Sequence, residues 1–207
     1  MVAATALKNA PWWTIGAAAG AVAALVIPGA AEWLVYERSA VAGGALWRLI
    51  TAHLVHYSAL HLCNNMLVLL FAGWLVEQRY RSDLPRIVGL SALSIGLAVF
   101  VFEPDITRYA GASGISLALL TYAALRGLAE NRRWRIVCTV VLVTICLKLA
   151  TENLFGWRGV DWMQQAGFVT VTLSHAIGVG VGFLIWLSHL VKHARGTPVR
   201  STTAINH

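Results

Sequence analysis

Charged residues are scarce in this sequence. Of its 207 residues, 12% are Asp, Glu, Lys or Arg and 58% are apolar, whereas a soluble domain carries about twice that charged fraction. The apolar residues fall in blocks close to the roughly 20 residues that a helix needs to cross a bilayer. Repeats, low-complexity runs and linkers are also lacking, and six blocks nearly fill the chain. The composition argues against a soluble protein and predicts one membrane domain.

Cysteine is rare, and so is any concentrated basic surface. Cys63, Cys138 and Cys146 lie inside apolar blocks without paired spacing, which disfavours a disulfide framework and a Cys-x-x-Cys zinc site. We interpret them as packing residues. The net charge of +7 is spread between the apolar blocks instead of forming one face or tail. Nucleic acid is therefore not an expected partner.

The apolar blocks predict an all-α polytopic membrane protein with six spans, at residues 10–30, 60–76, 84–102, 112–129, 134–151 and 167–191. The N-terminus and the segments on its side hold 11 of the 16 Lys and Arg residues, against four on the opposite side. The positive-inside rule then places both termini in the cytoplasm. We expect a single domain over residues 1–207, with a core from about 10 to 191 and a basic cytoplasmic tail at 192–207. Lys8 and the apolar run after it could alternatively form a cleaved signal peptide, which would leave the later topology unchanged.

A serine between glycines opens the fourth predicted span, in Gly111-Ala112-Ser113-Gly114. Its hydroxyl would lie at the positive end of the helix dipole, beside backbone N–H groups that can stabilise an oxyanion. Taken alone, the pattern more often reflects small residues that let helices pack closely.

The sixth span contains a histidine and a glycine stripe. A titratable side chain at the predicted depth of His175, about two turns from the outer end, indicates a functional site. Gly178 and Gly182 form a smooth stripe on the same general face, on which another helix can pack closely. If that helix is the fourth, Ser113 meets His175, which can take the serine proton as a general base. Because no Asp or Glu lies at a matching position in the spans, we expect a Ser–His dyad.

The segment that enters the second span is polar. His61 and Asn65 are four residues apart, so they share a helix face and can both donate hydrogen bonds to an oxyanion, or only to neighbouring helices. Three histidines lie close together in the sequence, His53, His56 and His61, which suggests a zinc site as an alternative. The His-x-x-x-His plus Glu pattern of metalloproteases is missing, so we expect no metal. A haem held by His61 and His175 is a further alternative.

Lys148 and Glu152 are four residues apart near the outer end of the fifth span. An ion pair would lower the cost of burying the ammonium group, although Lys148 could instead extend to the membrane interface. We favour a structural role for this pair over direct contact with substrate.

Together these motifs resemble the rhomboid intramembrane serine proteases. The resemblance covers roughly residues 45–190, and the motifs follow the family's order: Trp47-Arg48 in the first outward loop, His56, His61 and Asn65 at the second span, Gly111-x-Ser113-Gly114 in the fourth and His175-x-x-Gly178-x-x-x-Gly182 in the sixth. Thr51 and Glu77 also lie where rhomboids commonly carry such residues. The resemblance implies a compact six-helix rhomboid-like bundle without cofactor or metal.

The resemblance also implies a function, namely an endopeptidase that cleaves single-span membrane proteins near the outward face. Ser113 would be the nucleophile and His175 the general base, and the oxyanion would be held by His61, Asn65 and the Ser113 backbone N–H. The supporting residues would be Gly111, Gly114, His56, Gly178, Gly182, Trp47 and Arg48. Expected partners are transmembrane protein substrates and membrane lipids.

Finer features suggest a branch and a location. Tyr36-Glu37-Arg38 and the Lys148/Glu152 pair look more like the rhombosortase branch, which is associated with trimming C-terminal Gly-Gly sorting tails. The lean chain suits a bacterial inner membrane, with the site open to the periplasmic or outer side. The alternative is a catalytically silent rhomboid-like protein that binds transmembrane helices.

Overall fold

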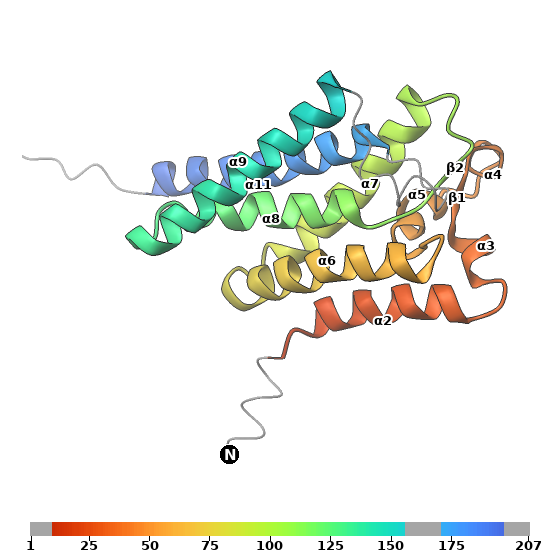
Figure 1. Ribbon diagram of the computed structural model, residues 1–207, viewed down its shortest axis with the longest axis horizontal. Coiled ribbons are helices and arrows are strands. Elements are labelled where there is room, and N and C mark those ends of the chain that lie inside the picture. Colours follow the sequence, from red (N-terminus) through yellow and green to blue (C-terminus); the bar gives the residue numbers. More distant parts are fainter. Residues whose placement is uncertain (1–9, 156–170, 197–207) are drawn as a thin grey trace, which may run out of the picture.

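The computed structural model describes residues 10–155 and 171–196. Its long helices run side by side, while the short elements gather at one end of the bundle (Figure 1). The helices are α2 (Trp12–Val26), α3 (Ala30–Leu34), α4 (Arg38–Ala42), α5 (Arg48–Thr51), η1 (Ala52–Leu54), α6 (Ala59–Arg79), α7 (Leu84–Phe102), α8 (Ser113–Gly127), α9 (Arg132–Leu154) and α11 (Thr172–Gly196), and the strands are β1 (Tyr36–Glu37) and β2 (Arg108–Tyr109).

Four helices are long and apolar enough to cross a membrane, namely α6, α7, α9 and α11. The helices α2 and α8 have 15 residues each, so the six-span bundle stays a prediction. The shortness of α8 fits its central position among α6, α7, α9 and α11 (Figure 1). Ala112 and Gly127, at its two ends, are both buried. A helix surrounded by protein does not need the full length that lipid contact demands.

The short elements refine two predictions. The first predicted span, 10–30, ends as a helix at Val26, and Gly29, with a φ of 77°, turns the chain into α3. The predicted all-α fold also contains one small β pair, in which Tyr36 lies opposite Tyr109 and Glu37 opposite Arg108. This pair ties the 31–60 segment to the loop between α7 and α8.

Some predictions concern residues outside the described ranges. They are the N-terminal segment up to residue 9, which includes Lys8, the loop at 156–166, the predicted start of the sixth span at 167–170, and the tail from residue 197.

The cysteines only partly fit their interpretation as packing residues. All three are unpaired, and Cys138 is buried. Cys63 and Cys146 are exposed on the outside of the bundle, so the interpretation is wrong for these two. A helix that faces lipid on one side tolerates such a small apolar side chain there.

Polar caps set where two long helices begin. Ser58 Oγ accepts a hydrogen bond from the backbone N–H of His61 at the start of α6, with a distance of 3.1 Å. Asn131 does the same for Trp134 N–H at the start of α9, also at 3.1 Å. Each cap satisfies one backbone donor that the first helical turn leaves free. The Ser58 cap thereby sets the start of α6 shortly before His61 and Asn65.

A buried carboxylate joins α6 to α2. Glu77 is 2% exposed and accepts hydrogen bonds from the backbone N–H groups of Trp13 (3.1 Å) and Thr14 (2.9 Å) and from the Thr14 hydroxyl (2.8 Å). These N–H groups lie in the first turn of α2, where they lack a helical acceptor and the helix dipole is positive. Glu77 therefore docks the start of α2 on the end of α6.

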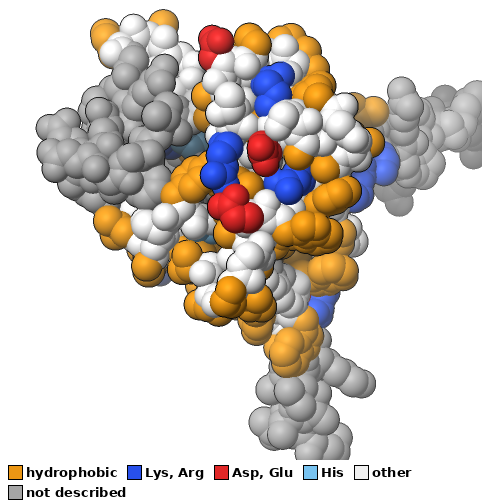
Figure 2. Space-filling model, turned by 90° about the vertical axis from the view of Figure 1, so that its right-hand side faces the viewer, with side chains coloured by type: hydrophobic (Ala, Val, Ile, Leu, Met, Phe, Trp, Pro, Cys, Tyr) orange, Lys and Arg blue, Asp and Glu red, His pale blue; other side chains and the backbone are white. Residues whose placement is uncertain are grey.

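Two arginines hold the short elements at the other end. Arg48 donates to the carbonyls of Glu32 (2.9 Å) and Val35 (2.8 Å), and Trp47 stacks on Trp33 at 5.3 Å between ring centroids. Arg38 donates to carbonyls at and after the end of α7, those of Val99, Phe100, Glu103 and Ile106. Figure 2 views this end, where basic and acidic side chains lie together amid hydrophobic ones.

Candidate active site

Ser113 is the first residue of α8. The turn before it is made by Gly111, whose φ of 122° lies in the left-handed region that glycine adopts without a Cβ clash. Because Ser113 is at the helix start, its backbone N–H has no partner within the helix. The Ser113 hydroxyl therefore lies at the start of α8, where backbone N–H groups have no acceptor within the helix, as the sequence predicts.

His175 lies directly beside this serine. Its Nε2 is 2.9 Å from Ser113 Oγ, and the side chain is 3% exposed. His175 is the fourth residue of α11, which begins at Thr172. The predicted depth of about two turns is therefore wrong, because the helix begins later than the apolar pattern indicates.

Glycines bring the two helices together. A Cβ on Gly178 would lie 2.0 Å from the Gly114 carbonyl oxygen, and a Cβ on Gly182 would lie 2.4 Å from that of Ala118. No side chain fits in such a space, so the backbones of α8 and α11 touch. Gly114 is equally confined, since its own Cβ would lie 2.6 Å from the Ser174 carbonyl oxygen. The helix that packs on the predicted stripe is thus the one that carries Ser113.

An acidic residue also reaches His175, and here the sequence prediction is wrong. Glu152, near the end of α9, places Oε2 2.8 Å from His175 Nδ1. Its other oxygen, Oε1, pairs with Lys148 Nζ, so the predicted ion pair is present. The side chain of Glu152 is 2% exposed and that of Lys148 is 41% exposed. The expectation that no Asp or Glu would contact His175 was wrong because Glu152 bridges two partners. Only its pairing with Lys148, four residues away, can be recognised in the sequence.

His61 and Asn65 lie on the side of Ser113 formed by α6. The position that a Cβ on Gly111 would occupy is 3.1 Å from His61 Nε2 and 3.8 Å from Asn65 Nδ2. Asn65 is buried and donates one hydrogen bond to the His61 carbonyl, at 3.2 Å. An amide nitrogen has a second hydrogen. Both nitrogens therefore border the turn that leads into Ser113.

A further histidine, His53, supports this turn. His53 Nδ1 is 3.0 Å from the Gly111 carbonyl oxygen and Nε2 is 3.0 Å from that of Ala92. Burial lowers the pKa of His53, although both carbonyls favour the charged ring. His53 thus ties the Gly111 turn to α7. Sequence reasoning missed this role, because the partners are backbone atoms of distant residues.

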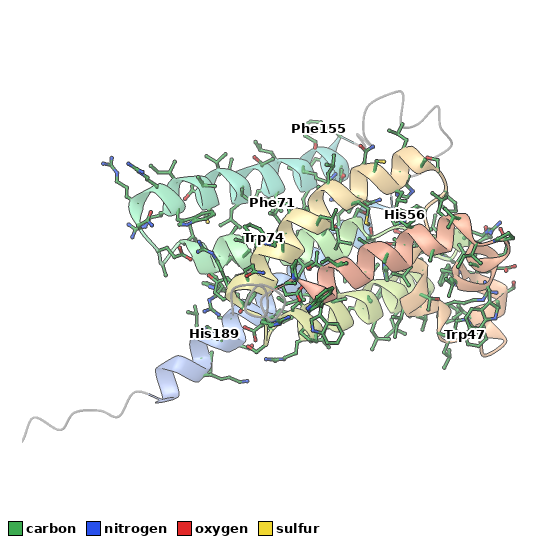
Figure 3. All side chains as sticks on the ribbon, turned by 90° about the horizontal axis from the view of Figure 1, so that it is seen from below. Trp47, His56, Phe71, Trp74, Phe155 and His189 are labelled. Atoms are coloured by element: carbon green, nitrogen blue, oxygen red, sulfur yellow. The ribbon has the colours of Figure 1, made fainter. Side chains whose placement is uncertain are left out.

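His56 packs behind His61. The two rings meet edge to face, with centroids 5.0 Å apart, and His56 Nδ1 is 3.2 Å from the Leu54 carbonyl oxygen. Burial and the neighbouring His61 lower the pKa of His56 to about 4, so its ring is neutral near pH 7. Figure 3 shows His56 within the bundle, while Trp47 lies at one end and His189 at the other. Trp47 caps the start of α5 and Arg48 is the first residue of that helix, so both belong to the cluster of short elements.

The alternatives that involve a metal ion can be compared with these contacts. Both ring nitrogens of His175 have protein partners, Glu152 and Ser113, whereas a haem ligand needs a nitrogen directed at iron. Among the side chains that the structure describes, at residues 10–155 and 171–192, no three His, Cys, Asp or Glu are grouped as a metal site. What the geometry offers is a hydroxyl, an imidazole and a carboxylate in line, the arrangement used for nucleophilic catalysis.

Comparison with known proteins shows which proteins this chain is similar to. The Rhomboid domain family model matches residues 43–191. The rhomboid protease GluP of Bacillus subtilis (strain 168) is 37% identical over 194 residues, which cover 82% of this chain and 37% of that protein. The rhomboid protease GlpG of Enterobacter sp. (strain 638) is 31% identical over 138 residues, covering 66% of this chain and 46% of that protein.

A second GlpG, from Salmonella newport (strain SL254), is 33% identical over 135 residues, covering 65% of this chain and 48% of that protein. The chain thus spans less than half the length of these curated relatives. The family match covers most of the chain, and four of the described helices have the length and composition of membrane spans. The chain is therefore an integral membrane protein of the rhomboid family.

Proposed function

We propose that this chain is an intramembrane serine endopeptidase, with Ser113 as nucleophile and His175 as general base. The observation that carries the proposal is the 2.9 Å distance between Ser113 Oγ and His175 Nε2, inside a site where the histidine is buried. A serine hydroxyl becomes a nucleophile when a neighbouring base removes its proton. The relatives named rhomboid proteases support the same class of reaction.

The reaction follows the usual course for a serine nucleophile. Ser113 Oγ attacks the peptide carbonyl carbon as its proton passes to His175 Nε2, and the tetrahedral intermediate then expels the amine, which takes that proton. The acyl-enzyme is hydrolysed by water activated by His175. Because this step needs water at membrane depth, the helices must enclose a polar cavity that opens outward.

The oxyanion of the intermediate is held from two sides. The Ser113 backbone N–H approaches from the start of α8, while His61 Nε2 and Asn65 Nδ2 approach from α6. Fixed donors stabilise charge that develops in the transition state more than they stabilise the substrate. The support for this assignment is that both side-chain nitrogens border the Gly111 turn.

The finer proposal concerns substrate and location. The substrate is a single-span membrane protein, cut near the outward face of a bacterial inner membrane, and both termini of the protease lie in the cytoplasm. The cleavage site of the substrate lies in its C-terminal tail, which carries a Gly-Gly motif, an apolar helix and a basic cluster. This part rests on the features shared with the rhombosortase branch, Tyr36-Glu37-Arg38 and the Lys148/Glu152 pair.

The test is cleavage of such a substrate by the purified protein in liposomes. Wild type is expected to cut it, whereas Ser113→Ala should lose on the order of 10⁶-fold in rate, as removal of a serine nucleophile does. A matched substrate whose Gly-Gly motif is replaced should be cut more slowly. Equal cutting by Ser113→Ala would remove Ser113 from its role. A silent helix-binding protein would bind the substrate and leave it intact in both cases.

A further inference from the structure

We propose that Glu152 is a positioning residue for His175, and that Lys148 determines how Glu152 does this. The proposal rests on the proposed protease function and goes beyond a site of serine and histidine alone. It starts from an unbroken chain of contacts: Lys148 Nζ to Glu152 Oε1, Glu152 Oε2 to His175 Nδ1 at 2.8 Å, and His175 Nε2 to Ser113 Oγ at 2.9 Å.

The carboxylate fixes the tautomer of the imidazole. An ionised carboxylate can only accept hydrogen bonds, so the nitrogen that faces it, Nδ1, carries the proton of the neutral ring. Nε2 is then left with a lone pair directed at the Ser113 hydroxyl. When His175 takes the serine proton, the resulting imidazolium lies beside the negative charge of Glu152. Glu152 thus acts through His175, without touching the substrate.

Burial makes this contact a specific one. The side chains of Glu152 and His175 are 2% and 3% exposed, so water does not take the place of either partner. A carboxylate buried to this extent needs compensation for its charge and for both of its oxygens. Lys148 satisfies Oε1 and leaves Oε2 for the histidine. The side chain of Lys148 is 41% exposed, so its ammonium is not enclosed with the pair and can extend toward the interface, which lowers the cost of placing it there.

Lys148 also makes the site intolerant of an amide. An ammonium group has only donors. In Glu152→Gln the amide oxygen therefore faces Lys148 in a charge-assisted hydrogen bond, and the NH₂ group faces His175 Nδ1. That arrangement places the ring proton on Nε2, which can no longer accept the serine proton. Without the ammonium, the amide can turn around and accept from Nδ1 again.

The experiment compares four variants with wild type for cleavage of the same single-span substrate, per mole of folded protein. Glu152→Gln should lower kcat on the order of 10²- to 10⁴-fold at similar KM, as an amide does in the equivalent position of other serine proteases. Lys148→Met alone keeps the carboxylate but leaves Oε1 without its partner, so kcat should fall, by less than in Glu152→Gln and by up to about tenfold. The double variant Glu152→Gln/Lys148→Met should recover about tenfold or more over Glu152→Gln. Asn153→Ala, at an exposed neighbouring position on α9, should match wild type.

Two further readouts separate positioning from folding. The rate of Ser113 modification by a fluorophosphonate should follow the same ranking, since it depends on the activated hydroxyl and not on substrate binding. Thermal unfolding in detergent should show no recovery in the double variant, because it lacks both partners of the ion pair. A purely structural Glu152 would lower the unfolding temperature and leave kcat per folded molecule unchanged.

The outcomes are distinct. Wild-type kcat in Glu152→Gln would overturn the proposal, and so would a double variant no faster than Glu152→Gln. Either result would leave the serine protease itself intact, provided that wild type cleaves and Ser113→Ala does not. If wild type neither cleaves nor reacts with the fluorophosphonate, the proposed function fails instead.

Discussion

His175 contacts Ser113 on α8 and Glu152 on α9, and the two contacts are held in place in different ways. On one side the backbones of α11 and α8 touch through Gly178 and Gly182, so the main chain sets the distance to Ser113. On the other side α9 contributes a single carboxylate, and a smaller share of α9 than of α11 is buried in the protein. The main chain therefore fixes the serine contact, whereas the Glu152 contact depends on one side chain from α9, a helix with a largely exposed surface.

A side chain at Gly178 should disrupt the close packing of α8 and α11. Gly178→Ala would place a methyl group 2.0 Å from the Gly114 carbonyl oxygen, so α8 and α11 must move apart. A misplacement of about 1 Å costs on the order of 10²-fold in rate, and the overpacking costs about 1–3 kcal/mol of stability. Cleavage rates and thermal unfolding in detergent measure the two effects.

The matched control for this prediction is Gly180→Ala. It lies on the same helix, but a Cβ there meets nothing within 4 Å, so rate and stability should both stay near wild type. If Gly178→Ala and Gly180→Ala behaved alike, the close approach of the two backbones would not be what sets the Ser113–His175 distance.

A second prediction separates the oxyanion side from the packing. Asn65→Ala removes one donor and should lower kcat by about 10²-fold, because that hydrogen bond forms fully only in the transition state. KM and the position of the Ser113–His175 pair should change little. Asn64→Ala, on the less buried adjacent position, is the control. A rise in KM without a fall in kcat would assign Asn65 to substrate binding instead.

The smallest effect is expected where α8 meets α9. In Gly127→Ala the new methyl group would lie 2.4 Å from Cys138 Sγ, which is the end of a side chain that can rotate away. The better helix propensity of alanine partly offsets this, so stability should change by less than about 1 kcal/mol. Unchanged kcat is expected. A loss as large as that of Gly178→Ala would show that α9 is held as rigidly as α11.

The same difference explains what the sequence could predict. The glycine stripe on α11 is a local pattern that indicates close packing. It led to the prediction that Ser113 and His175 lie side by side. The helix predicted at 84–102 is confirmed, because Pro85 and Glu103 bound its apolar block clearly. Glu152 was missed because its contact with His175 depends on how α9 packs, and no local pattern encodes that. The carbonyl partners of His53 and the Tyr36–Tyr109 pair are hidden for the same reason.

The central claim is that Ser113 and His175 share a proton. The most direct test is to treat the purified protein with a fluorophosphonate and to locate the adduct by mass spectrometry in wild type and His175→Ala. The account predicts one adduct, on Ser113, that forms at least about 10²-fold more slowly without the imidazole. An adduct on another residue, or equal rates in the two proteins, would contradict it.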